Sequence, residues 1–256
     1  MDPNQQQLLL TGGAKSDPVY VDDVFSTTLY DGTNVSGRAV TNNIDMAGEG
    51  ALLWVKRRDS ANNHILVDSE RGPTKYIYSN AQNGNTDSSS RVESFSSTGF
   101  VTGGSSDTNG GPGDRYVSWS FRKKKGFFDI VTYTGSGSYK TVAHNLGCIP
   151  GMYMIKRTDT TSNWIVHHKD LSSAAHRLIL NTDEIQNDLY SLNNNTRPTA
   201  SVFSVGSDST VNASGGTYVC YLFAGGYSSD ANAKSVDFDG QEGLDVPASS
   251  SLNLGT

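Results

Sequence analysis

The sequence predicts an all-β protein made of two tandem β-sandwich or jelly-roll units, preceded by an extended N-terminal arm. Three observations lead to this prediction: a composition rich in turn-forming residues, short runs of aromatic and β-branched residues, and an internal repeat. Apolar residues make up 35% of the chain and 27 of the 256 residues are glycine, against about 45–50% apolar residues in an average soluble domain. Helix-forming residues are so sparse that only two short helical turns are expected, at 171–175 and 183–189.

The internal repeat sets the predicted domain boundaries. Leu53–Leu66 aligns with Tyr153–Val166 without a gap, and similar matches flank both stretches in the same order. Because chance matches do not keep their order and spacing, the sequence contains two diverged copies of one unit. We place them at residues 24–122 and 126–226, joined by a basic linker at 123–125. Such a linker is typical of a solvated connection rather than a phosphate site.

Each copy carries its own strand signals. Tyr116–Phe121 and Tyr218–Phe223 mix aromatic and β-branched residues, as half-buried strands do. Trp54–Val55 is followed, after a polar turn, by Ile65–Val67, and the second copy repeats this arrangement, which predicts a hairpin in each. Short strands separated by Ser-, Asn- and Gly-rich turns favour a β-sandwich or jelly roll.

Two segments lie outside the repeat. In the arm, residues 1–23, a small apolar cluster on a polar segment is either part of a disordered leader or a docking site that orders against another protein; the candidate docking residues are Gln5, Gln6, Gln7, Leu8, Leu9 and Leu10. Residues 227–256 are expected to be a linker and the first strands of a further domain, in a polypeptide that continues beyond Thr256.

Charge and hydropathy exclude several classes of partner. The net charge is −6, with 20 basic and 26 acidic residues spread along the chain, so no nucleic-acid partner is expected. No apolar run approaches the ~18 residues of a membrane span. Cys148 and Cys220 do not have metal-ligand spacing and are expected to be free thiols.

No catalytic residue, metal site or cofactor is predicted. His167 and His168 are adjacent on an expected strand, so their side chains point to opposite faces. The loop 107–114 has oxygen ligands but not the spacing of a calcium loop, and its composition favours a turn. Aromatic residues that would bind a glycan if they were exposed, rather than packed in the core, are Tyr76, Tyr78, Tyr139 and Trp164.

The repeat resembles a unit found in tandem in tail-fibre and other virion appendage proteins of marine and cyanobacterial phages. The stretches that carry the resemblance in the first copy are Trp54–Asp59, Asp68–Gly72, Ser94–Phe100 and Tyr116–Trp119. Those in the second copy are Ile130–Gly135, His144–Gly147, Met154–Arg157 and Gly215–Val219. Val236–Thr256 resembles the start of a laminin-G-like, concanavalin-type domain. One departure is that Asp170-Leu171-Ser172 stands where the first copy has Glu70-Arg71-Gly72.

The resemblance implies a non-enzymatic structural component of a phage particle, assembled in the cytoplasm of the bacterial host. The arm would attach to other virion proteins of the tail or head, the β-units would form a stalk of a tail fibre or fibre-like appendage, and the chain would be a homotrimer by analogy. Alternatives are a host-recognition module that binds a surface glycan and a capsid decoration or head-fibre protein. A glycan-cleaving enzyme comes last.

Overall fold

A computed structural model describes residues 20–188 and 190–225. Their regular structure is almost entirely antiparallel β-sheet, which confirms the all-β prediction. The first-copy strands are β1 (Phe25–Asp31), β2 (Arg38–Thr41), β3 (Ala51–Arg57), β4 (Ile65–Asp68), β5 (Gly72–Tyr78), β6 (Thr86–Asp87), β7 (Val92–Ser96), β8 (Gly99–Thr102) and β9 (Arg115–Arg122). The second-copy strands are β10 (Phe128–Thr134), β11 (Lys140–Ala143), β12 (Pro150–Arg157), β13 (Trp164–His168), β14 (His176–Ile179), β15 (Asn187–Asp188), β16 (Val202–Val205) and β17 (Thr217–Ala224).

The described helices are single turns: α2 (Val21–Val24), α3 (Tyr190–Asn193) and α4 (Ser209–Asn212). The helical turns expected at 171–175 and 183–189 were wrong as far as the structure describes them. Residues 171–175 form turns and bends, and part of the second stretch pairs as the short strand β15. These segments contact neighbouring strands, and this tertiary pairing overrides a weak local helix preference.

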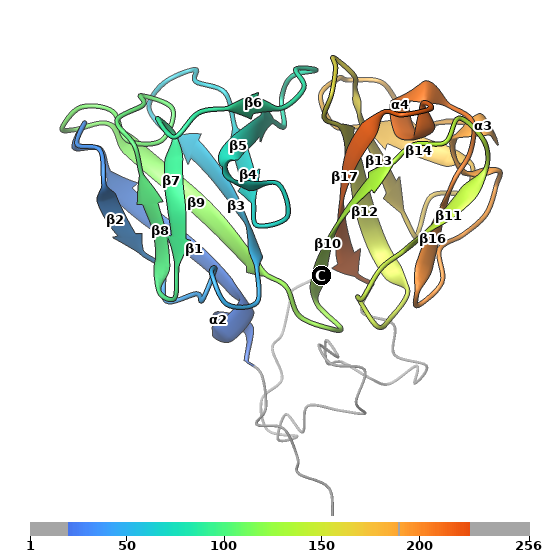
Figure 1. The fold of residues 1–256 in the computed structure, drawn as a ribbon, viewed down its shortest axis with the longest axis horizontal. Coiled ribbons are helices and arrows are strands. Elements are labelled where there is room, and N and C mark those ends of the chain that lie inside the picture. The colour runs from blue at the N-terminus through green and yellow to red at the C-terminus, as the bar shows by residue number, and fades with distance from the viewer. Residues whose placement is uncertain (1–19, 189, 226–256) are drawn as a thin grey trace, which may run out of the picture.

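The large sheets of the two copies have the same strand order, whereas the small sheets differ by one strand (Figure 1). The first forms a six-stranded sheet in the order β1-β9-β3-β4-β5-β6 and a small sheet β2-β8-β7. The second forms a six-stranded sheet in the order β10-β17-β12-β13-β14-β15 and a small sheet β11-β16. The large sheets therefore match strand for strand, and the repeat visible in the sequence is a repeat of strand order.

A core lies between the large and the small sheet of each copy. In the first copy, Val40 and Phe100 of the small sheet pack with Val55 and Tyr116 of the large one. The corresponding residues of the second copy are Val142, Phe203, Ile155 and Tyr218. Each copy is thus a two-layer sandwich with its own buried core.

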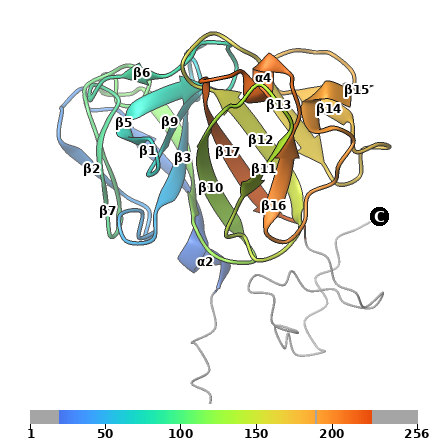
Figure 2. The same cartoon turned by 45° about the vertical axis from the view of Figure 1, so that its right-hand side comes forward.

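A third core joins the two copies. The first copy contributes Leu52, Leu66 and Ile77, and the second contributes seven further buried residues that include Trp164 and Tyr221. The two large sheets thus face each other, and the small sheets lie outside them (Figures 1 and 2). Because both faces of these sheets are covered, β4 is buried at all four of its positions instead of alternating with solvent.

The linker between the copies is held by ion pairs. Lys123 Nζ lies 2.6 Å from Glu70 Oε1 of the first copy and 3.6 Å from Asp129 Oδ1 of the second, and Lys124 pairs with Phe128 in an isolated β-bridge. Nearby, the rings of Phe25 and Phe223 both contact Phe121, with centroid distances of 5.0 and 5.5 Å. The start of β1 and the end of β17 therefore lie at the same end of the molecule (Figure 1). The residues predicted to dock, Gln5 to Leu10, and the segment 226–256 lie outside the described residues.

Candidate functional site

Of the four aromatic residues considered for glycan contact, three are not open surface groups. Trp164 is completely buried between the copies, and its Nε1 donates a hydrogen bond of 2.7 Å to the Tyr78 carbonyl oxygen. Tyr76 is 5% exposed and lies under the guanidinium of Arg91, 4.0 Å from its ring centroid. Tyr78 is half-buried and contacts Tyr76 edge-on. Trp164 and Tyr76 are corrected to core residues, since covered rings cannot stack on a sugar.

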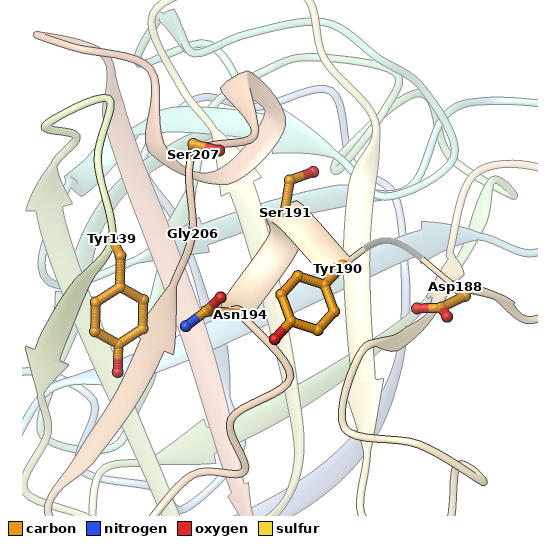
Figure 3. A pocket seen from close by; sticks show the side chains of 7 residues that line it. All are labelled: Tyr139, Asp188, Tyr190, Ser191, Asn194, Gly206 and Ser207. Carbon is orange, nitrogen blue, oxygen red and sulfur yellow. The ribbon is translucent and has the colours of Figure 1, made fainter.

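Tyr139 alone of the four is well exposed, and it lines a surface groove. Tyr139 is 49% exposed. The groove has a volume of about 660 Å³, which is within the range of small-molecule sites. Its lining residues come from the ends of β11, β15, α3 and β16 and are Tyr139, Asp188, Tyr190, Ser191, Asn194, Gly206 and Ser207 (Figure 3).

A second exposed tyrosine stands opposite the first. Tyr190 begins α3 and is 61% exposed. Figure 3 shows Asn194 between the two tyrosines in that view, with Asp188 beyond Tyr190. The hydroxyls of Tyr139 and Ser204 are 3.2 Å apart, which places one end of the Tyr139 side chain against β16.

Among the described residues of the second copy, no strand corresponds to β7, and the groove lies beside β16 where such a strand would pair. In the first copy β7 pairs with β8, and the Glu93 carboxylate on β7 accepts hydrogen bonds from Ser36 Oγ and the Gly37 backbone N–H. Tyr139 directly precedes β11 as Gly37 directly precedes β2. Asn194 stands two residues after Leu192, whose carbonyl oxygen accepts from Gly206 N–H as the Arg91 carbonyl oxygen, two residues before Glu93, accepts from Gly103 N–H. The helix α3 and the loop after it therefore stand where the first copy has β7, which pairs with β8.

The backbone that supports the groove is tightly fitted. The Gly206 N–H donates a hydrogen bond of 2.6 Å to the Leu192 carbonyl oxygen, and a Cβ at Gly206 would lie 2.0 Å from the Ser191 carbonyl oxygen. Asn194 has a φ of 55°, a left-handed conformation that asparagine tolerates better than most residues. The Asn194 N–H caps α3 by donating to the Tyr190 carbonyl oxygen, at 2.9 Å.

A buried polar group lies in the contact between the copies. Asp68 Oδ2 is 2.6 Å from Arg71 Nε and accepts a hydrogen bond of 2.7 Å from the Tyr221 hydroxyl. Arg71 Nη2 also donates to that hydroxyl, at 3.1 Å, and Arg71 Nη1 donates to Asn85 Oδ1, at 2.8 Å. Burial raises the pKa of Tyr221 well above its usual value, so the hydroxyl keeps the proton that it donates.

Other polar contacts continue this junction. Lys156 Nζ donates to the Gln82 carbonyl oxygen of the first copy at 3.0 Å, and to two carbonyl oxygens of its own copy. Desolvation by burial lowers the pKa of Lys156 to about 8. A second hollow of about 530 Å³ lies at the same junction, but Glu70 and Arg71 in its lining are already paired with Lys123 and Asp68. These groups hold the two copies together.

The carboxylates of the loop 107–114 are paired with other side chains of the first copy. Asp107 pairs with Arg91 at 2.8 Å, Asp114 with Arg57, and the Asn109 amide donates to two backbone carbonyl oxygens. In residues 20–188 and 190–225, no group of three or more His, Cys, Asp or Glu side chains is placed to hold a metal ion. None of the helices in the described part of the chain is long and apolar enough to cross a membrane.

The two adjacent histidines have different surroundings, as the strand alternation predicts. His167 is 1% exposed and stacks on Tyr153, while the His168 side chain is 42% exposed. Burial lowers the pKa of His167, which favours the neutral ring. Neither His167 nor His168 lines the groove described above.

The comparison with protein families decides the classification. A family model matches residues 21–235. The chain belongs to DUF7483, a domain of unknown function. Among curated proteins, the comparison found no match. The DUF7483 match spans both copies and the linker, and the two large sheets that it covers share a core.

Sequence reasoning missed Tyr190 and Asn194 in the groove and Tyr221 at the junction. The signal for the groove was that Val92–Ser96 reads as a strand while the aligned second-copy segment does not. The signal for the junction was the departure from Arg71 to Leu171. Neither signal predicts which residues come into contact, because the contacting residues belong to segments that are distant in the sequence.

Proposed function

We propose that this protein is a non-enzymatic structural component of a phage particle, in a tail fibre or a fibre-like appendage. The observation that supports this most is the third core. It joins two β-sandwiches into one body through about as many buried residues as each sandwich core has, together with the buried group of Asp68, Arg71 and Tyr221. A particle appendage needs a stiff part that keeps its shape without chemistry, and a duplicated sandwich with a shared core meets that need.

Within this proposal the remaining segments have separate roles. Residues 1–23 attach the protein to other virion proteins through Gln5 to Leu10, and residues 24–226 form the rigid part, the stalk of the appendage. The protein assembles as a homotrimer and needs no cofactor. Of these roles, only that of the rigid part draws on the described residues.

Electron microscopy of particles tests the proposal. Gold-labelled antibody against residues 24–226 is applied to intact and disrupted particles, with antibody pre-adsorbed on the purified protein as the control. We expect label on the tail or at the bases of fibres. Label spread over the head would instead identify a capsid decoration protein, and absence of label from both preparations would contradict a place in the virion.

A further inference from the structure

The groove between Tyr139 and Tyr190 has the chemistry of a carbohydrate site. Tyr139 and Tyr190 are 49% and 61% exposed, although large aromatic residues are usually more buried. A pyranose ring has an apolar face of C–H groups that packs on an aromatic ring, as other apolar groups do. Two exposed rings on opposite sides of one groove offer two such contacts.

Polar groups that match sugar hydroxyls lie between and beside the rings. Asn194 supplies both a donor and an acceptor, Ser207 supplies a hydroxyl, and Asp188 supplies a carboxylate that accepts two hydrogen bonds. These side chains are exposed, and Figure 3 shows them around the tyrosines. A few polar groups beside apolar surface are typical of small-molecule sites, where they fix the orientation of the ligand.

The charge of the groove favours neutral sugars over acidic ones. Asp188 is the only charged residue in its lining, so an acidic sugar would meet an unfavourable charge and no cation to offset it. A peptide strand added beside β16 would compete with hydrogen bonds already made at the two ends of that strand. The Val202 carbonyl oxygen accepts from the Thr199 N–H at 2.8 Å, and the Gly206 N–H donates to the Leu192 carbonyl oxygen.

The corresponding region of the first copy is built differently. There β7 pairs with β8 along the corresponding edge, and the Glu93 carboxylate accepts a hydrogen bond from the Gly37 backbone N–H. The second copy has α3 in place of β7 and a tyrosine at each side of the groove. The helix α3, which lines the groove, and the nearby α4 lie at the end of the molecule away from α2 and from the end of β17 (Figure 1).

We propose that the groove lined by Tyr139, Tyr190, Asn194 and Asp188 binds a neutral oligosaccharide, with the two tyrosine rings stacking on sugar rings. This inference does not depend on a place in the virion. It assigns to the second copy a recognition role that the first copy does not have.

Calorimetric titration of the full chain tests the inference. The probes are the neutral oligosaccharides maltoheptaose, cellohexaose, mannohexaose and xylohexaose, with hexagalacturonic acid as the anionic comparison. We expect saturable binding of at least one neutral probe. Tyr139→Ala and Tyr190→Ala should each weaken it by about tenfold or more, because aromatic contacts of this kind dominate binding energies.

The matched control is Tyr20→Ala, because Tyr20 is 58% exposed and lies outside the groove. This variant should bind as the unchanged protein does, and circular dichroism should show the same spectrum for all three variants. The inference is overturned if no neutral probe binds, if both groove variants keep full affinity, or if hexagalacturonic acid binds more tightly than every neutral probe.

Discussion

Asp68, Arg71 and Tyr221 bring charged and hydrogen-bonding groups into a largely apolar contact. The sequence marked Asp68–Gly72 as a stretch that carries the resemblance and Arg71 as a position where the copies differ. It could not give the reason, because Tyr221 is 150 positions from Arg71 in the chain. The partner depends on how two sheets face each other, and no local pattern encodes that. In the second copy, Leu171 needs no such partner because the junction is asymmetric.

Replacing Arg71 with leucine, the residue of the second copy, should destabilise the protein strongly. Removal of one partner leaves the Asp68 carboxylate buried without its cation, which costs about 3–5 kcal/mol in comparable buried pairs. Urea denaturation of Arg71→Leu measures the loss in the free energy of unfolding. The double variant Asp68→Asn with Arg71→Leu should recover part of it, and equal stability of the single and double variants would contradict the role of the buried charge.

At the scale of elements, the strands of the repeat were predictable and the connections were not. Aromatic and β-branched runs located β3, β4 and β9 and their second-copy counterparts, since strand signals are local. The sequence did not give the replacement of β7 by α3, which makes the groove. Polar segments of similar composition can form a short strand, a helical turn or a loop, and neighbouring strands decide between these.

Gly135, directly after β10, should not tolerate a side chain. A Cβ there would lie 2.1 Å from the Ala213 carbonyl oxygen, and the aligned Gly32 would meet the Gly110 carbonyl oxygen at 2.4 Å. Gly135→Ala should therefore lower the free energy of unfolding by about 1–3 kcal/mol, as overpacking does. Thermal unfolding followed by circular dichroism measures it. Gly111→Ala is the control, because nothing lies within 4 Å of a Cβ at Gly111, and equal effects of both changes would contradict the close approach.

At the scale of the whole molecule, the repeat predicts two units, at residues 24–122 and 126–226, but it does not predict the third core, which only the structure shows. The runs Ala51–Val55 and Ile65–Val67 do not alternate with polar residues, which is the sequence sign of a sheet covered on both faces. That sign does not say what covers the second face. A small sheet, another copy or another chain would leave the same pattern, so the face-to-face pairing of the large sheets could not be derived.

The shared core should make the two copies unfold together. Val55→Ala and Ile155→Ala shorten aligned core residues of the first and second copy, which are 0% and 2% exposed. Each change should shift one common transition to lower urea concentration, because a weakened copy exposes the third core and takes the other copy with it. Circular dichroism and tryptophan fluorescence should give coincident curves. Two separate transitions in either variant would indicate copies that unfold independently.

The nearness of the two described ends has a mechanical consequence. Tension applied between Tyr20 and Gly225 acts across one end of the molecule instead of along its length. β1 is an edge strand whose pairing with β9 starts at Phe25 and Phe121. A pull on the N-terminal end of β1 would therefore break the hydrogen bonds of this strand pair one after another, from that end. β17 lies between β10 and β12 and is held from both sides. The first copy would therefore lose its N-terminal strand at low force, before β17 of the second copy is released.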